Sequence, residues 1–233
     1  MAKNKYLDFI SDRDLLECVQ WVCDAYPENA SEIDMERLHK NTLDPFKLFF
    51  DIFNRGDNVE DWLKVENARQ IDKKVNNKIG EFHQKLLGKI AGWEDLGIGD
   101  LTGLDIKKSD NSIFIELKNK ENTVNSSSMA KLFDKLDNGL KKYPNATFYW
   151  GFVYSKKGDS GEKVWKYLGK ENPKIKLVWG KKLYGLVTGD KDALDKLFKI
   201  LPKVISDLID SKKLIEKTQM EKIKDIFNES FKS

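Results

Sequence analysis

Apolar side chains recur every three or four residues in several stretches of this chain, and such spacing predicts amphipathic helices. The longest stretch covers residues 66–92. Further helices are expected at residues 11–25, 44–55, 128–142, 190–210 (bent or broken near Pro202) and 212–231. The stretch 44–55 carries several phenylalanines, a pattern typical of core packing and occasionally of a dimer face.

Other stretches are rich in β-branched and aromatic residues, which favour strands. Residues 147–154 predict a buried strand, and residues 113–118 a strand with one apolar face, preceded by a strand at 104–107. Two or three more strands are expected within 162–187. A loop or bent first strand is marked by the glycines Gly97, Gly99 and Gly103. The order of elements predicts an α/β fold with a helical crossover between parallel strands.

Candidate chemistry lies on the predicted hairpin. Ten residues separate Asp105 from Glu116, and Lys118 follows Glu116 two positions later. Because side chains alternate between the two faces of a strand, with a rise of about 3.3 Å per residue, Glu116 and Lys118 share a face. Folding of the hairpin can therefore bring Asp105 beside Glu116 and Lys118.

Two carboxylates beside a lysine are suited to metal-dependent cleavage of a phosphodiester. Mg²⁺ prefers oxygen ligands and keeps several water molecules. One such water can be the nucleophile, while Lys118 orients it or helps to deprotonate it and stabilises the developing charge. Charged residues make up 34% of the chain, so a chance grouping on a solvated strand face is the alternative.

A longer pattern surrounds these three residues. It consists of the segments 77–84, 92–93, 97–99, 103–105 and 116–128. The pattern resembles the PD-(D/E)xK nuclease superfamily, although Gly103-Leu104 stands where that superfamily has its eponymous proline. Over about residues 70–155, it resembles the type II restriction endonucleases that cleave GGNCC-like and GGWCC-like sites.

The resemblance implies a restriction-endonuclease-like core, in which helices flank a mixed central sheet, with helical N- and C-terminal additions. It also implies a homodimer that uses Mg²⁺ to cut both strands of DNA, with a cognate DNA methyltransferase as its genetic partner. The catalytic residues that carry over are Asp105, Glu116 and Lys118, of which the two acids would bind the metal. Glu81 is a further candidate, as the helical acidic residue that many such nucleases place near the metal.

A polar segment follows the predicted catalytic strand. Residues 119–128 are rich in amides and hydroxyls, which can contact base edges and phosphates. We expect DNA contacts from Asn119, Lys120, Asn122, Asn125, Ser126, Ser127 and Ser128. The alternative is an ordinary polar loop in which residues 126–128 cap the following helix.

Composition bounds the size and setting of the protein. A chain of 233 residues, 40% of them hydrophobic, can form one large domain. Its expected parts are a helical part (1–65), a catalytic core (66–187) and C-terminal helices (188–233). No apolar run approaches the ~20 residues of a membrane span, and the N-terminus lacks a signal-peptide stretch, so a cytoplasmic protein is expected. The two cysteines, Cys18 and Cys23, are expected to be buried thiols.

Charge and histidine content are less decisive. Net charge is only +3, but residues 156–182 hold nine lysines against three acidic residues. This stretch either follows DNA phosphates or is a solvated lysine-rich hairpin. Enzymes built on several histidines are largely excluded because the chain has two, and His83 is expected to be a packing or hydrogen-bonding residue.

These patterns favour a type II restriction endonuclease. A repair or junction-resolving nuclease of the same fold is one alternative. A non-catalytic DNA-binding or helical interaction protein, in which the Asp, Glu and Lys are coincidental, is the other. Cleavage of plain plasmid DNA that needs Mg²⁺ and produces discrete ends would separate the first from both alternatives.

Overall fold

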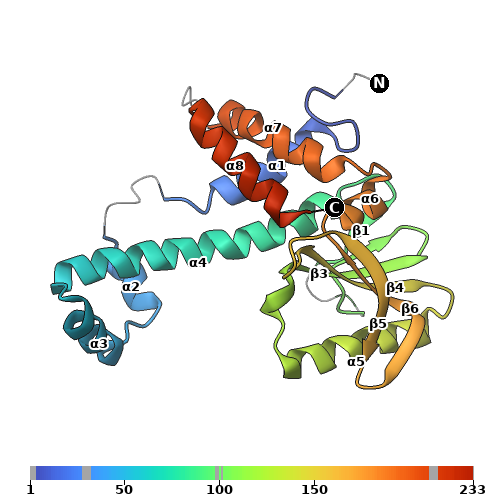
Figure 1. Ribbon diagram of the computed structural model, residues 1–233, viewed down its shortest axis with the longest axis horizontal. Helices are drawn as coiled ribbons and strands as arrows, with labels where there is room; N and C mark the ends of the chain where they lie inside the picture. The colour runs from blue at the N-terminus through green and yellow to red at the C-terminus, as the bar shows by residue number, and fades with distance from the viewer. Residues whose placement is uncertain (1–3, 28–32, 98–99, 101, 210–214, 233) are drawn as a thin grey trace. The chain divides into compact units, whose positions relative to one another are not determined.

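A computed structural model describes residues 4–27, 33–97, 100, 102–209 and 215–232 of the chain. Its central feature is a mixed sheet of six strands in the order β1-β2-β3-β4-β6-β5 (Figure 1). The strands are β1 (Trp93–Asp95), β2 (Ile106–Lys108), β3 (Ile113–Lys120), β4 (Thr147–Tyr154), β5 (Gly161–Tyr167) and β6 (Lys170–Trp179). Strands β3, β4 and β6 are parallel, and the pairs β1–β2, β2–β3 and β5–β6 are antiparallel. The expected mixed sheet is confirmed.

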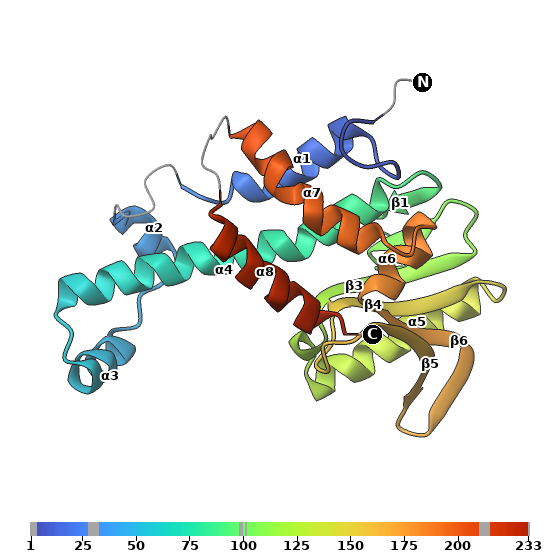
Figure 2. The same cartoon turned by 45° about the horizontal axis from the view of Figure 1, so that its top comes forward.

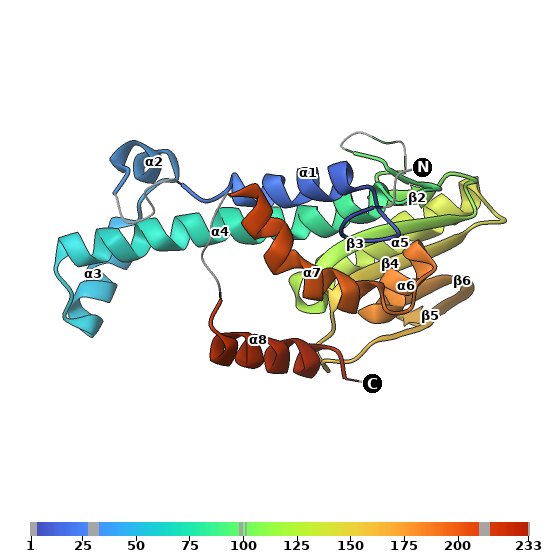
Figure 3. The ribbon, with the colours of Figure 1, turned by 90° about the horizontal axis from the view of Figure 1, so that it is seen from above.

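Helices cover both faces of this sheet. The helices of the described residues are α1 (Asp12–Cys23), α2 (Met35–Lys40), α3 (Pro45–Arg55), α4 (Val59–Gly88), α5 (Ser126–Lys142), α6 (Lys181–Thr188), α7 (Ala193–Leu208) and α8 (Lys217–Ser230), with a short 3-10 helix η1 (Glu121–Thr123). Helix α5 lies on one face and forms the predicted crossover between the parallel strands β3 and β4 (Figure 1). Helices α6, α7 and α8 lie on the other side (Figures 2 and 3). The rings of Phe198 in α7 and Phe227 in α8 stack with centroids 4.0 Å apart.

The chain divides into two compact units. One comprises residues 1–19 and 80–233 and contains the sheet, and the other comprises residues 20–79 and contains α2, α3 and much of α4. Among the described residues, every helix is too short or too polar to cross a membrane. Both cysteines are free thiols; Cys18 is buried as expected, and Cys23 is half-buried.

Several element boundaries differ from the expected ones. The strand expected before β3 starts at Ile106, and the long helix runs from Val59 to Gly88. The last part of 162–187 is helix α6, not strand, because Leu183, Tyr184 and Val187 are buried at helical spacing. Such a short apolar run does not separate the two structures by its sequence alone. Parts of the expected loop and helices lie outside the described residues: Gly99, Asp210 and residues 212–214.

The phenylalanine stripe of α3 is the clearest departure. Asp44 caps the helix by accepting hydrogen bonds from the backbone N–H groups of Phe46 and Lys47, and Pro45 begins it. The stripe is exposed, not buried: the exposed fractions are 76% for Phe46, 62% for Phe49, 71% for Phe50 and 85% for Phe53. Core packing was therefore the wrong expectation for this face, and a dimer face stays a prediction.

The main core lies between α5 and the sheet. Helix α5 contributes four large buried side chains, which pack on Phe114 of β3 and on Phe148, Trp150 and Phe152 of β4. Gly139 permits this close packing, because a methyl group there would meet a ring carbon of Phe148 at 2.4 Å. The helix is thus held close to the strands that carry the candidate site.

Two helical glycines give a matched test of this packing. We expect Gly139→Ala to destabilise the protein by about 1–3 kcal/mol, because the added methyl group overpacks the core. Gly185→Ala in α6 should instead stabilise it by about 0.5–1 kcal/mol, since the methyl group comes no closer than 3.5 Å to Lys191. Urea denaturation of the two variants measures both values. Equal effects would contradict the role assigned to Gly139.

Candidate active site

The three candidate residues of the predicted hairpin come together beside β3, an interior strand of the sheet. Asp105 directly precedes β2, and its backbone N–H donates to Ile115 O of β3 at 3.2 Å. Its carboxylate accepts from Leu117 N at 2.6 Å, which fixes it beside β3. Glu116 and Lys118 project from the same face of β3, as the two-residue spacing predicts.

Lys118 connects the two carboxylates. Its Nζ donates to Glu116 Oε1 at 2.7 Å and lies 3.8 Å from Asp105 Oδ2. The Glu116 side chain is only 9% exposed, whereas that of Lys118 is 35% exposed. The lysine therefore stands between a buried acid and the solvent.

Helix α5 supplies a fourth charged group, Lys135, which the sequence analysis missed. Its Nζ donates to Glu116 Oε2 at 2.5 Å. Gly103, with φ +64°, allows this approach: a Cβ at that position would lie 3.2 Å from Lys135 Cε. The sequence holds so many lysines that nothing in it distinguishes Lys135; only the crossover brings it to β3.

Burial makes it costly for the carboxylates of this cluster to carry negative charge. The pKa of Asp105 is raised to about 6, first by burial and then by the negative charge of Glu116. The ammonium groups of Lys118 and Lys135 and the amide of Leu117 oppose that rise in pKa. Two carboxylates thus face two ammonium groups within hydrogen-bonding or ion-pairing distance.

A cavity of about 310 Å³ opens beside these groups, between β3 and α5. Its lining residues are Glu116, Lys118, Thr123, Val124, Ser128, Lys131, Leu132 and Lys135. The cavity therefore joins the candidate catalytic groups to the polar segment at the start of α5.

The donor set fits a hard divalent cation with few protein ligands. No group of three or more His, Cys, Asp or Glu side chains suited to a metal occurs among the described residues. Asp105 and Glu116 supply two carboxylates, which suits Mg²⁺ because this ion keeps waters and binds substrate phosphate oxygens alongside one or two carboxylates. Neither sulfur nor imidazole lies in the set, so a zinc-type site does not match it.

The polar segment emerges at the same end of β3. Asn119 and Lys120 end the strand, Asn122 lies in η1, and Asn125 accepts from Ser128 N as the N-cap of α5. Six of the seven residues expected to contact DNA are exposed: Lys120, Asn122, Asn125, Ser126, Ser127 and Ser128. The expected cap at residues 126–128 was wrong, because these serines form the first turn and Asn125 caps it.

Asn119 and Glu81 lie differently from the others. By strand alternation, Asn119 points away from the face of Lys118, and its Oδ1 is buried without a hydrogen-bond partner among the described residues. A Cβ on Gly80 of α4 would lie 4.0 Å from Asn119 Cβ, so α4 passes on that opposite face. Glu81 follows Gly80 and is exposed. Its role near a metal stays a prediction.

His83 is a buried structural residue, as expected. Its Nδ1 is 2.6 Å from the hydroxyl of Tyr184, and its exposed fraction is 8%. Burial lowers the pKa of its imidazole to about 4, which keeps the ring neutral at neutral pH.

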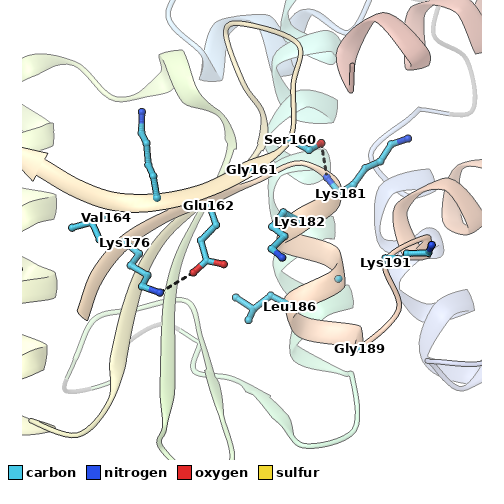
Figure 4. A pocket seen from close by; sticks show the side chains of 12 residues that line it. Ser160, Gly161, Glu162, Val164, Lys176, Lys181, Lys182, Leu186, Gly189 and Lys191 are labelled. Carbon is cyan, nitrogen blue, oxygen red and sulfur yellow. Dashed lines mark hydrogen bonds and ion pairs between the residues drawn. The ribbon is translucent and has the colours of Figure 1, made fainter. Parts of the chain in front are cut away.

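The lysine-rich stretch forms the β5–β6 hairpin and the start of α6. A cavity of about 880 Å³ lies beside it. Lys176 and Glu162 line this cavity (Figure 4), and Lys176 Nζ donates to Glu162 Oε1 at 2.9 Å. Glu116 of β3 pairs with Trp150 of β4, and Trp150 pairs with Leu177 of β6, so these three side chains share one face of the sheet. Lys176 precedes Leu177 in β6 and therefore points to the other face. Lys176 and this cavity therefore belong to the face opposite the candidate site. Phosphate contact by the stretch stays a prediction.

Together, a mixed sheet with helices on both faces and an Asp-Glu-Lys cluster at the β2–β3 hairpin define a restriction-endonuclease-like protein. A model of the family described as Eco47II restriction endonuclease matches residues 7–210. The chain therefore belongs to the Eco47II restriction endonuclease family. This membership confirms the expected type II restriction endonuclease and favours it over the repair nuclease and the non-catalytic protein.

Two relatives support the same conclusion. The type II restriction enzyme Sau96I of Staphylococcus aureus is 34% identical over 90% of this chain and 84% of its own length. The type II restriction enzyme Eco47II of Escherichia coli is 30% identical over 87% of this chain and 88% of its own length. The similarity thus extends over both compact units and includes the candidate site.

The raised pKa of Asp105 predicts a stability test. Its folded pKa of about 6 exceeds the ordinary 3.8, so ionisation of this buried acid opposes folding. The contribution of Asp105 to stability should fall as pH rises towards and through 6, and metal-free Asp105→Asn should be more stable than wild type by about 2 kcal/mol at pH 8. The gain should vanish near pH 4. Thermal unfolding with a chelator measures it.

Asp110 provides the control with the opposite sign. Hydrogen bonds from Ser112 lower its pKa to about 2, so its ionised form favours the folded state above the unfolded pKa. Asp110→Asn should therefore lower stability at pH 8 and lose its effect in acid. A destabilised Asp105→Asn at pH 8 would contradict the burial cost assigned to Asp105.

Proposed function

We propose that this restriction endonuclease uses Mg²⁺ held by Asp105 and Glu116, with Lys118 as the third catalytic residue. The observation that carries the proposal is the contact of Lys118 with Glu116 at 2.7 Å and its approach to Asp105 at 3.8 Å. A divalent cation is the cofactor that the family implies, and the two carboxylates match the preference of Mg²⁺ for oxygen ligands.

Each side chain has a distinct role in this proposal. Mg²⁺ would supply an activated water and neutralise charge on the phosphate. Asp105 is held by the amide of Leu117, and Glu116 is fixed within the core, so both carboxylates have set positions before DNA arrives. Lys118 is the most exposed of the three and faces the cavity, where it can orient water and stabilise charge that develops on the phosphate.

The DNA partner is proposed to lie along the exposed polar segment. Lys120 and Asn122 are exposed just after Lys118 in the chain, and Ser128 in the first turn of α5 lines the cavity, so this segment can reach groove edges and phosphates. A target of the GGNCC or GGWCC type follows from the resemblance. A homodimer completes the proposal, because two copies of the site would provide one for each strand. It would act in the cytoplasm, with a cognate methyltransferase as its genetic partner.

Substitution of the catalytic residues tests this function. We expect Asp105→Ala and Lys118→Ala to reduce Mg²⁺-dependent cleavage of phage DNA by at least about 10³-fold, since each removes a group that acts on the transition state. Gel analysis of the digests measures the loss, and sequencing of the wild-type ends gives the target. Full cleavage by folded Asp105→Ala would refute the metal site.

Matched controls come from the turn at the far end of the hairpin. Asp110→Ala and Lys108→Ala remove an acid and a lysine from an exposed ion pair of 3.1 Å. Both should cleave at the wild-type rate. A loss equal to that of the catalytic variants would show that charge or folding, and not these particular groups, limits the reaction.

Lys120 tests target reading. It is exposed at the end of β3, on the face of Glu116 and Lys118, and a lysine can donate to guanine O6 and N7. Lys120→Ala should weaken binding to target DNA by about tenfold or more and weaken binding to other DNA less. Fluorescence anisotropy without divalent cation measures both. Equal losses on all DNA would indicate a phosphate contact. Lys108→Ala, at the far end of the hairpin, is the control.

A further inference from the structure

A second lysine stands at the candidate metal ligand. Lys135 comes from α5 and not from the hairpin, and its Nζ donates to Glu116 Oε2 at 2.5 Å, while Lys118 donates to Oε1. The Glu116 side chain is 9% exposed, so few water molecules can replace these donors. Both oxygens of this carboxylate are thus taken by ammonium groups.

The local structure accommodates Lys135 in this position. Gly103 lies against its Cε, where a Cβ would be 3.2 Å away, and the glycine has a φ of +64° that other residues rarely adopt. Leu132, one turn before Lys135, and Leu136, the residue after it, are buried in the main core. The helix is therefore fixed, and the long lysine side chain reaches from it to β3.

Charge explains why the contact exists. Without a bound cation, the carboxylates of Asp105 and Glu116 carry two negative charges, which the ammonium groups of Lys118 and Lys135 balance. Unbalanced carboxylates in a largely buried site would be costly. A divalent cation brings two positive charges to the same oxygens and makes the second lysine redundant there.

We propose that Lys135 is a positioning residue that occupies Glu116 Oε2 in place of the metal, so that metal binding and release of the Lys135 ammonium are coupled. The inference rests on the proposed function, in which Glu116 is a metal ligand. The released ammonium remains in the cavity of about 310 Å³, which Lys135 lines together with Ser128 and Lys131.

The sign of one measurement distinguishes this role from a purely structural one. If Lys135 competes with the cation, Lys135→Met should bind Mn²⁺ about tenfold more tightly than wild type, a gain of roughly 1.4 kcal/mol. If Lys135 only supports the site, its loss should loosen Glu116 and weaken binding. Calorimetric titration of the DNA-free protein at pH 8 reads this affinity independently of cleavage.

Three further variants complete the experiment. Lys135→Arg keeps the positive charge and should bind Mn²⁺ within about threefold of wild type. Lys141→Met removes another α5 lysine that is paired with an acid, Asp137 at 2.8 Å, and should leave the affinity unchanged. Lys135→Gln is the neutral substitute should Lys135→Met fail to fold, as judged by thermal unfolding.

The outcomes separate the two proposals. The metal site itself would be overturned if the wild-type protein did not bind Mn²⁺, or if Glu116→Gln bound it as tightly as wild type. Glu116-dependent binding that is unchanged or weaker in folded Lys135→Met would overturn only the role of Lys135. Tighter binding in Lys135→Met, retained wild-type affinity in Lys135→Arg and no change in Lys141→Met would support it.

Discussion

The candidate site depends on placing two like charges together in a largely buried position. Asp105 and Glu116 repel each other and lose hydration, and the raised pKa of Asp105 reflects both effects. The arrangement persists because Lys118, Lys135 and the Leu117 amide point at these carboxylates. Such a site is suited to a divalent cation, since the cation would reduce the repulsion between the two carboxylates.

The crossover from β3 to β4 determines which groups can supply that compensation. Parallel strands require a long connection, and here α5 provides it while burying one face against the sheet. Its first turn starts next to the end of β3, and Lys135 lies over Glu116. One helix therefore completes the core, holds the second lysine and presents exposed serines beside the site.

The sequence predicted the parts of the site that depend on local periodicity. Glu116 and Lys118 had to share a face of β3, and the turn residues 109–111 predicted the hairpin that brings Asp105 to them. Lys135 could not be found in this way, because its contact depends on the packing of α5 across the sheet. The same limit explains α3: its phenylalanines show a helical stripe, but not what covers it, and the stripe is exposed.

DNA cleavage and target recognition place different demands on the sequence. The carboxylates and lysines of the site constrain one another through distances below 4 Å, so replacing any one changes the charge balance of the others. The residues from Lys120 to Ser128 are mostly exposed, and a substitution there leaves the core packing intact. If these exposed residues contact the target as proposed, the fold leaves target reading freer to vary than the cluster of carboxylates and lysines.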